Sequence, residues 1–315
     1  MRNDGLDNLA DSDKGRSPGN CGDALTAEGI ASLLKTDGVF QVEVRETVTS
    51  TNTVLREMAA NNAPEGLVLA AEGQTAGKGR QGRDFHSPAG CGAYFSLLLR
   101  PGASGADALL ITSAAAVAAA RAIEEIFGVR VGIKWVNDLF MDGKKVCGIL
   151  TEAVIGTEGR KRENHQEKNR NGGEGGATNG HAPHSGQEGR EFMVTSAVLG
   201  IGINITSPEQ GYPEGIRGVA TALTYREQGK SLERCRLISS TLDNFWKYYQ
   251  NLAGRGFLDE YRRRSIVLGR DIYVLSGGSK RPARALAIDD NCGLVVRYED
   301  GEAATLGYGE VSIRL

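Results

Sequence analysis

The sequence has few cysteines and almost no net charge, and each shortage excludes a class of protein. Its five cysteines are widely scattered, and no two of them form a C-x-x-C pair. This pattern is typical of free thiols in a reducing compartment and argues against a disulfide framework or a metal cage. The formal net charge is −2, so the chain as a whole does not attract phosphate backbones or anionic lipid, and any anion must be bound locally.

Apolar runs long enough to enter or cross a membrane are also missing. Residues 1–23 are polar and contain no apolar segment that could act as a secretory signal. The most apolar helical stretch, residues 106–127, is interrupted by Thr112 and turns charged at Arg121 and Glu124, which indicates a core helix rather than a membrane span. We therefore expect a cytoplasmic protein with no membrane partner and with a disordered tail over residues 1–23.

Hydrophobic periodicity predicts alternating helices and strands. The expected helices are residues 51–60, 106–127 and 231–251, with a shorter one from residue 26. The apolar runs short enough to be strands are residues 67–71, 94–99, 131–135, 146–154 and 194–205, and residues 40–44 alternate like a half-buried strand. Because helices lie between or after strands, this order predicts an α/β or α+β domain with a mixed sheet.

Residues 157–191 differ in kind from the sequence around them. They contain no valine, isoleucine, leucine, methionine, phenylalanine, tyrosine or tryptophan, so they have nothing to bury. We expect a flexible low-complexity insertion in the connection between two neighbouring antiparallel strands, whose removal leaves the core standing. Its three histidines, His165, His181 and His184, lack the rigid spacing and the carboxylate or thiolate partners of a metal site, and no metal site is expected.

The C-terminal part, from about residue 266, has a different pattern again. Four short β-like segments are separated by Gly-Gly, Asp-Asp-Asn-Cys-Gly and Asp-Gly turn signals. They predict a small all-β barrel over residues 266–315, which forms a second domain after a main domain over residues 24–265.

The segment that follows the apolar run at residues 67–71 concentrates glycine and positive charge. Its glycines expose backbone N–H groups and its cations stand between them: Gly77, Lys78, Gly79, Arg80, Gly82 and Arg83. We interpret this loop as a cradle for an anion. It does not match a Walker A loop, and no G-x-G-x-x-G opens a helix in a βαβ unit. Taken alone, the loop is equally compatible with a basic surface that contacts RNA.

Two further segments accompany this loop. Residues 134–153, KWVNDLFMDGKKVCGILTEA, predict a hairpin that presents cations, an amide and a carboxylate from one tip. Residues 199–205, LGIGINI, end an apolar strand in alternating glycines, where missing side chains would let a flat ligand lie against the sheet.

Six motifs, taken together and in order, resemble those of the bacterial biotin protein ligases, enzymes that biotinylate the carrier domain of carboxylases. They are STN at 50–52, GQTAGKGRQGRDFHSP at 73–88, KWVNDL at 134–139, KKVCGIL at 144–150, GIGINI at 200–205 and GEVSIR at 309–314. The resemblance runs from about residue 26 to residue 315, apart from the insertion. It implies an α+β fold, in which residues 24–265 form a class II aminoacyl-tRNA synthetase-like catalytic domain with a mixed sheet that binds biotin and ATP, followed by a small SH3-like barrel.

The resemblance also implies a two-step reaction. Biotin and ATP give biotinyl-5′-AMP and pyrophosphate, and the adenylate then acylates a lysine of the biotin carboxyl carrier domain of acetyl-CoA carboxylase or another biotin-dependent carboxylase. Attack of a carboxylate on an anionic α-phosphate needs dense positive charge, typically with Mg²⁺ on the polyphosphate. The catalytic residues implied are Lys145, nearest the reacting oxygens, Arg80, and Asp138 as a metal contact or as acceptor for the proton of the incoming lysine.

The same resemblance assigns the binding residues. Those implied to hydrogen-bond the ureido ring of biotin are Ser50, Thr51, Asn52 and Gln74. Those implied to line the carboxylate and phosphate side are Lys78, Gly79, Arg80 and Lys145, and the binding residues also include Gly77, Arg83 and Lys134. Asn137 would face the ATP and Phe85 would pack on adenine, although core packing stays open for Phe85. The glycines at 148 and 202 (Gly148 and Gly202) would offer flat backbone to the biotin rings, with Asn204 at the end of that strand.

Departures from the family pattern, and a short N-terminal region, limit what the resemblance carries. Lys78, Phe85 and Val136 stand where Arg, Trp and Pro are usual, which puts affinity in doubt more than activity. The stretch before Ser50 leaves no room for a three-helix DNA-binding unit, so we expect a monofunctional ligase with no DNA partner. Whether the chain forms a homodimer stays open.

Two alternatives remain. A lipoate protein ligase-like enzyme shares the catalytic fold and the acyl-adenylate chemistry, but its usual loop has consecutive glycines and a histidine-aspartate pair that AGKGRQGRDFHSP lacks. A nucleic-acid-binding module would use GKGRQGR and the barrel, and it predicts salt-dependent binding without ATP turnover. The near-neutral charge and the lack of an aromatic stacking platform in the barrel argue against that module.

Overall fold

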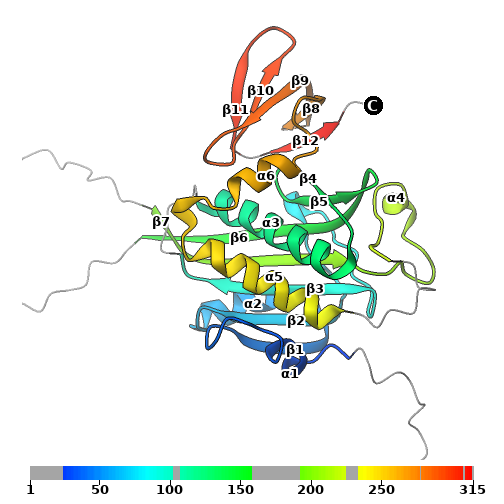
Figure 1. The fold of residues 1–315 in the computed structure, drawn as a ribbon, viewed down its shortest axis with the longest axis vertical. Coiled ribbons are helices and arrows are strands. Elements are labelled where there is room, and N and C mark those ends of the chain that lie inside the picture. The colour runs from blue at the N-terminus through cyan, green and yellow to red at the C-terminus, as the bar shows by residue number, and fades with distance from the viewer. Residues whose placement is uncertain are drawn as a thin grey trace, which may run out of the picture.

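A mixed seven-stranded sheet organises the larger part of the chain (Figure 1). The computed structural model describes residues 24–101, 107–157, 192–224, 233–276, 278–307 and 309–313. The expected tail over residues 1–23 and residues 158–191 of the expected insertion lie outside the described residues. The strands are β1 (Gln41–Val48), β2 (Leu67–Gln74), β3 (Gly92–Leu99), β4 (Gly132–Lys134), β5 (Asp138–Met141), β6 (Lys144–Thr157) and β7 (Phe192–Asn204).

The strand order across this sheet is β1-β2-β3-β7-β6-β5-β4. Only β1 and β2 are parallel among the described pairs, and every other neighbouring pair in this sheet is antiparallel. The expected mixed sheet is therefore confirmed. Strands β6 and β7 pair as far as Thr157 and Phe192, which confirms that the 157–191 segment connects two neighbouring antiparallel strands.

The two faces of the sheet are covered unequally because side chains alternate along each strand. Helices α3 (Asp107–Phe127) and α5 (Arg234–Tyr249) cover one face, where the main core gathers apolar residues of β2, β3, β6 and β7. On the other face, α2 (Thr51–Ala60) packs Leu55 against Leu69, Leu98 and Val198. Helix α2 covers only part of this second face. The site described below lies on the part that α2 leaves uncovered, next to the first turn of the helix.

A separate antiparallel sheet of five strands follows, with order β11-β10-β9-β8-β12, and it is consistent with an SH3-like domain. The strands are β8 (Asp271–Ser276), β9 (Ser279–Ile288), β10 (Leu294–Tyr298), β11 (Ala303–Leu306) and β12 (Glu310–Ile313). The sequence predicted four segments and recognised the Asp-Gly turn signal, but it left residues 294–306, which contain that signal, as one segment. Instead the chain turns at Asp300 and at Gly301, whose φ is 89°, so this segment forms the hairpin of β10 and β11.

Short elements and free thiols complete the described fold. These elements are α1 (Ala27–Ala31), α4 (Glu214–Arg217), α6 (Leu258–Arg264), and the 3₁₀ turns η1 (Arg80–Gly82) and η3 (Leu252–Gly254). The cysteines that the structure describes, Cys91, Cys147, Cys235 and Cys292, are free, as expected. Among the helices of the described ranges, none has the length and apolar character needed to cross a bilayer.

The second sheet is joined to the first domain through the segment between β4 and β5. The indole Nε1 of Trp135 donates to the backbone oxygen of Cys292 at 2.9 Å, and the Tyr261 hydroxyl of α6 donates to the backbone oxygen of Val136 at 3.0 Å. Trp135 and Tyr261 are buried. These contacts hold the residues that precede Asn137 and Asp138 in a fixed position between the two domains.

Candidate active site

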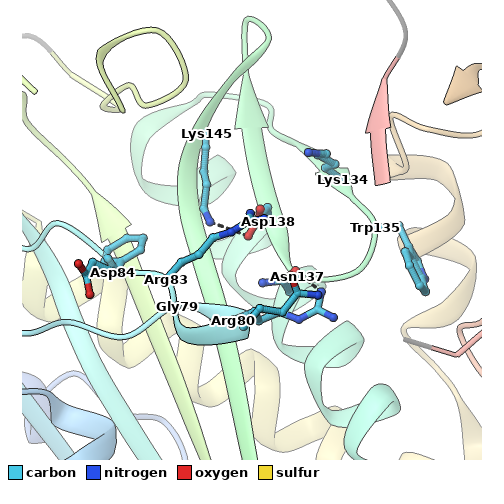
Figure 2. A pocket seen from close by; sticks show the side chains of 11 residues that line it. Gly79, Arg80, Arg83, Asp84, Lys134, Trp135, Asn137, Asp138 and Lys145 are labelled. Carbon is cyan, nitrogen blue, oxygen red and sulfur yellow. Dashed lines mark hydrogen bonds and ion pairs between the residues drawn. The ribbon is translucent and has the colours of Figure 1, made fainter. Parts of the chain in front are cut away.

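The glycine-rich loop after β2 folds back on itself as a tight hairpin. The backbone N–H of Gly79 donates to the Arg83 oxygen at 2.6 Å, and that of Phe85 donates to the Gly77 oxygen at 2.8 Å. A Cβ added to Gly77 would lie 2.4 Å from the backbone oxygen of Phe85, so this close approach requires glycine. Figure 2 shows the side chains of Arg80 and Arg83 extending from this loop toward Asn137 and Asp138.

Arg80 ties this loop to two distant segments. Its Nη1 donates to Oδ1 of Asn137 at 2.9 Å, and its Nη2 donates to the backbone oxygen of Gly309 at 2.9 Å. Asn137 in turn donates through Nδ2 to the backbone oxygen of Ile149 at 2.8 Å. The structure therefore brings together Arg80 and Asn137, which the sequence placed in one site, and it adds the segment before β12, which the sequence did not.

Lys145 and Asp138 form an ion pair beside this loop. Lys145 Nζ lies 2.8 Å from Asp138 Oδ1 and 5.8 Å from the centroid of the Phe85 ring. Both charged side chains are partly exposed, at 31% and 22%. The next residue but one, Cys147, is fully buried, and burial raises the pKa of its thiol well above the ordinary value.

Most of the cations that the sequence singled out line one pocket (Figure 2). Its lining residues are Gly79, Arg80, Gln81, Arg83, Asp84, Phe85, Lys134, Trp135, Asn137, Asp138 and Lys145. Four cationic side chains and two carboxylates line it, and Lys134 Nζ also lies 5.4 Å from the Phe140 ring centroid. A pocket with this excess of positive charge is suited to a polyanion such as a polyphosphate.

A second pocket adjoins the first at Phe85 and is polar. It is lined by Ser50, Thr51, Asn52, Gln74, Lys78, Phe85, Gly148, Leu150, Gly200, Ile201 and Gly202. All the site residues predicted from the sequence line one of the two pockets, except Gly77 at the base of the loop and Asn204. Lys78 is exposed, and its backbone bridges that of Asp84 across the loop hairpin.

The first turn of α2 is held by Gln74. Its Oε1 accepts from the Thr51 backbone N–H at 2.8 Å, and its Nε2 donates to Ser87 Oγ at 2.8 Å, which donates to the Phe85 backbone oxygen at 3.0 Å. Ser50 is the N-cap residue, but its side chain makes no capping hydrogen bond. The Gln74 carboxamide therefore accepts from one free backbone N–H at the start of α2, that of Thr51, whereas the Ser50 side chain bonds to none of them.

Asn52 points into the protein and is bonded at both ends of its carboxamide. Nδ2 donates to Glu152 Oε2 at 2.9 Å, and Oδ1 accepts from Ser96 Oγ at 2.6 Å. The sequence analysis missed Glu152 and Ser96. Each was marked by being a polar residue inside an otherwise apolar strand run, but only the pairing of the strands shows that both reach Asn52.

The floor between the two pockets is made of glycine backbone covered by the Phe85 ring. A Cβ added to Gly202 would lie 2.4 Å from the ring, and one added to Gly148 would lie 3.0 Å from it. With the ring in this position the polar pocket has a cavity of about 20 Å³, less than a ligand larger than water needs. A flat ligand that lies on this floor must therefore move Phe85 aside.

Asn204 binds the segment that pairs with the backbone of Lys145. Its Nδ2 donates to the backbone oxygen of Thr221 at 3.1 Å, and the backbone of Lys145 bonds to Val219 and Thr221 at 2.7 and 2.9 Å. Residues 219–221 thus run beside the start of β6 and fix its backbone at Lys145. Val219, which the sequence analysis did not single out, is 57% exposed next to the cationic pocket.

Comparison with known proteins places this site in a family. A model of the biotin/lipoate A/B protein ligase family matches residues 44–162. The bifunctional ligase/repressor BirA of Bacillus subtilis is 31% identical over 287 residues, which cover 88% of this chain and 76% of that protein. The chain belongs to the biotin protein ligase family. A biotin–[acetyl-CoA-carboxylase] ligase of Paracoccus denitrificans is also similar to this biotin protein ligase, with 27% identity over 80% of this chain and 92% of that protein.

The fold of this biotin protein ligase agrees with that of solved structures. The biotin protein ligase of Aquifex aeolicus in complex with biotin and ATP matches with a TM-score of 0.60 at 24% identity, covering 87% of this chain and 98% of that chain. The apo structure of the same Aquifex protein matches with a TM-score of 0.59. The expected catalytic fold with a mixed sheet is thereby confirmed.

Proposed function

We propose that this biotin protein ligase uses ATP to activate biotin as an acyl-adenylate and transfers it to a lysine of a biotin carboxyl carrier domain. In the first step a carboxylate oxygen of biotin attacks the α-phosphorus, and pyrophosphate leaves. In the second step the lysine amine attacks the acyl carbon, AMP leaves, and an amide forms with loss of one proton. Membership of the family supports ligation to a carrier protein. The two adjoining pockets support the binding of an acid beside a nucleotide.

The convergence of cations at one end of the site is the observation that carries this proposal. Arg80, Lys134 and Lys145, with Arg83, line the pocket next to the polar one. A carboxylate and an α-phosphate repel each other, and fixed positive charge in a partly desolvated pocket lowers that repulsion most where the two oxygens meet. Lys145 Nζ, beside Phe85 at the junction of the two pockets, is the group best placed to contact both reactants.

The polar pocket suits the other end of biotin. The Thr51 hydroxyl at the start of α2 and the Gln74 carboxamide at the end of β2 both line this pocket. A ureido ring offers two N–H donors and one carbonyl acceptor and can therefore use groups of both kinds. The floor at Gly148 and Gly202 would carry the fused rings after Phe85 has moved, and Phe85 could then stack on adenine.

Mg²⁺ would enter with the polyphosphate. Among the residues that the structure describes, no three His, Cys, Asp or Glu side chains converge as a metal cage. Asp138 is the pocket carboxylate placed to contact such an ion, and its pairing with Lys145 would then have to loosen. A bound Mg²⁺ supplies charge neutralisation on the phosphates. In the second step Asp138 is the candidate acceptor for the proton of the acceptor lysine.

The test is exchange of labelled pyrophosphate into ATP that depends on biotin. The wild-type protein is expected to catalyse it, and Lys145→Ala and Arg80→Ala are expected to lower kcat/KM by about 10²- to 10³-fold because each removes a charge aimed at the reacting oxygens. Lys144→Ala is the matched control, since Lys144 is the exposed first residue of β6, directly before Lys145, and lines neither pocket.

Two results would contradict the proposal. Exchange with lipoate and not with biotin would assign the chain to the lipoate side of the broader family, and no exchange with either acid would remove the adenylation step. The transfer step is checked separately by mass spectrometry of a purified biotin carboxyl carrier domain incubated with enzyme, biotin and ATP. A mass increase of one biotinyl group on the carrier lysine is the expected result.

A further inference from the structure

A continuous chain of polar side chains runs from the surface of α2 to the wall of the polar pocket. Arg56 Nη1 donates to Glu152 Oε1 at 2.9 Å, and the other oxygen of Glu152 accepts from Asn52 Nδ2 at 2.9 Å. Ser96 Oγ lies 2.6 Å from Asn52 Oδ1 and 2.7 Å from Thr51 Oγ1. Thr51 then ends the chain at the pocket.

The charged end of this chain fixes which way Asn52 points. Glu152 is paired with Arg56, and an ionised carboxylate can only accept hydrogen bonds. The Asn52 group that faces Glu152 must therefore be the donor, Nδ2, whose other hydrogen points toward the Leu150 backbone oxygen at 3.4 Å. Oδ1 of Asn52 is thereby directed at Ser96.

The number of hydroxyl hydrogens then determines whether Thr51 can donate a hydrogen bond to a ligand. Ser96 has one hydroxyl hydrogen, and Asn52 Oδ1, which has none, takes it at 2.6 Å. The single hydrogen of Thr51 has two acceptors within reach, Ser96 Oγ at 2.7 Å and Gln74 Oε1 at 3.2 Å. In either case that hydrogen is used inside the protein. Thr51 Oγ1 is left with only lone pairs for a ligand.

The register of three strands holds this arrangement in place. Ser96 of β3, Gly200 of β7 and Leu150 of β6 lie side by side in one row. Asn52 lies on Gly200, where an added Cβ would be 2.0 Å from Oδ1. Asn52 is 4% and Ser96 0% exposed, so water does not compete for their hydrogen bonds, and a reversal of polarity would leave a buried group unpaired.

We infer that Glu152, Asn52 and Ser96 are positioning residues that make Thr51 an obligatory hydrogen-bond acceptor, so that the pocket selects a ligand offering an N–H group at that point. For the proposed function, on which this inference rests, that group is a ureido N–H of biotin. Asn52 therefore acts through Ser96 and Thr51 rather than by contact with the ligand. The row of polar side chains from Arg56 to Thr51 therefore sets substrate specificity through the direction of its hydrogen bonds.

The first experiment removes the donor of the Asn52–Glu152 link and then supplies a donor from the other side. Asn52→Asp places a carboxylate oxygen against Glu152, and we expect the Kd and KM for biotin to rise at least tenfold, with the KM for ATP and kcat changed less than threefold. Adding Glu152→Gln supplies an amide donor to the carboxylate introduced at position 52, and the double variant is expected to recover most of the loss. Asn62→Asp, an exposed site after α2, is the matched control.

The second experiment uses ligands that lack one donor. Biotin methylated at one or the other ureido nitrogen is compared with biotin by titration calorimetry. One of the two isomers is expected to bind wild-type protein at least tenfold more weakly than the other. Thr51→Val, which keeps the shape and removes the acceptor, is expected to bring the two isomers within about threefold of each other. Thermal unfolding of each variant shows whether it is folded.

The outcomes separate this inference from the proposed function. Wild-type exchange with biotin, together with an Asn52→Asp variant that binds biotin like wild type, or a folded double variant with no recovery, overturns the relay alone. Equal weakening by both methyl isomers also overturns it, because no single acceptor then selects the donor. If wild-type protein neither binds biotin nor supports exchange, the proposed function fails, and the inference fails with it.

Discussion

At the scale of single residues, two glycines of β7 are required for different reasons. Gly200 leaves room for the Asn52 carboxamide, which is held at both ends and cannot move without breaking buried hydrogen bonds. Gly202 leaves room for the edge of the Phe85 ring, a side chain that can rotate away. The alternating glycines of β7 that predicted a flat ligand surface are therefore also needed for packing. Only at Gly200 is the neighbouring side chain, Asn52, held in place.

Gly200→Ala is expected to lower both stability and biotin affinity. The added methyl group would displace Asn52, at a cost of about 1–3 kcal/mol in the free energy of unfolding, and the Kd for biotin is expected to rise at least tenfold. Urea denaturation and calorimetry measure the two effects. Gly256→Ala is the control, because a Cβ there meets no atom within 4 Å. A Gly200→Ala protein with unchanged biotin affinity would show that the Asn52 position is not needed.

At the scale of elements, α6 is fastened to α3 by a network of charges around Glu260. Glu260 is 8% exposed and accepts from Arg121 Nε at 2.6 Å and from Arg264 Nε at 2.8 Å, while Arg264 also pairs with Glu124. Burial opposes ionisation of Glu260, but the hydrogen bonds from both arginines outweigh it, and the pKa of Glu260 is lowered. This network holds α6, and with it the Tyr261 hydrogen bond to the Val136 backbone oxygen.

The lowered pKa predicts a loss of stability in acid. A carboxyl group with a lowered pKa in the folded state contributes its full stability above its unfolded pKa of about 4.3. This contribution is lost as the pH falls below that value and through the lower pKa of the folded state. Glu260→Gln is expected to lower the free energy of unfolding by about 1–3 kcal/mol at neutral pH and by clearly less below about pH 4. Urea denaturation at both pH values measures this.

Glu43→Gln provides the matched control for that series. Glu43 pairs with Arg45 at 3.3 Å on the surface, where both side chains are more than 40% exposed, at 44% and 43%. Exposed pairs of this kind contribute about 0–1 kcal/mol. A Glu260→Gln effect as small as that of Glu43→Gln, or one that did not change with pH, would contradict the role given to the network.

At the scale of the whole molecule, the C-terminal domain takes part in shaping the site. It accepts the Trp135 hydrogen bond through Cys292 and the Arg80 hydrogen bond through Gly309. Both donors come from segments that line the cationic pocket. The Cys292 thiol is itself buried, which raises its pKa to about 11, so it is a packing residue of this junction.

Trp135→Phe is expected to loosen this junction without emptying the core. Loss of the indole N–H leaves the buried oxygen of Cys292 without this donor, which costs about 1–3 kcal/mol. Because Asn137, two residues further on, orients Arg80, the KM for ATP is expected to rise more than the KM for biotin. Pyrophosphate exchange at varied ATP and biotin measures the two constants. Equal changes in both constants would indicate general destabilisation instead.

Much of this protein could be predicted from the order of its residues because the signals are local. Strand and helix positions follow from apolar spacing within ten to twenty residues, and the six motifs identify the family and most residues of the two pockets. At the hairpin of β10 and β11 the Asp-Gly turn signal was recognised, but the residues on its two sides were not separated into two strands. The expected tail and most of the insertion lie outside the described residues and stay predictions.

The direction of the hydrogen bonds in the site was decided only by the tertiary structure. Asn52 reaches Ser96 across 44 residues and Glu152 across 100, and Arg80 reaches Gly309 across 229. These contacts depend on the register of β3, β7 and β6 and on where α2 and the C-terminal domain pack. Sequence periodicity shows which face a side chain occupies, but it does not show which distant partner shares that face. The reason is physical, since a hydrogen bond needs two atoms at one distance and angle, and those are set by packing.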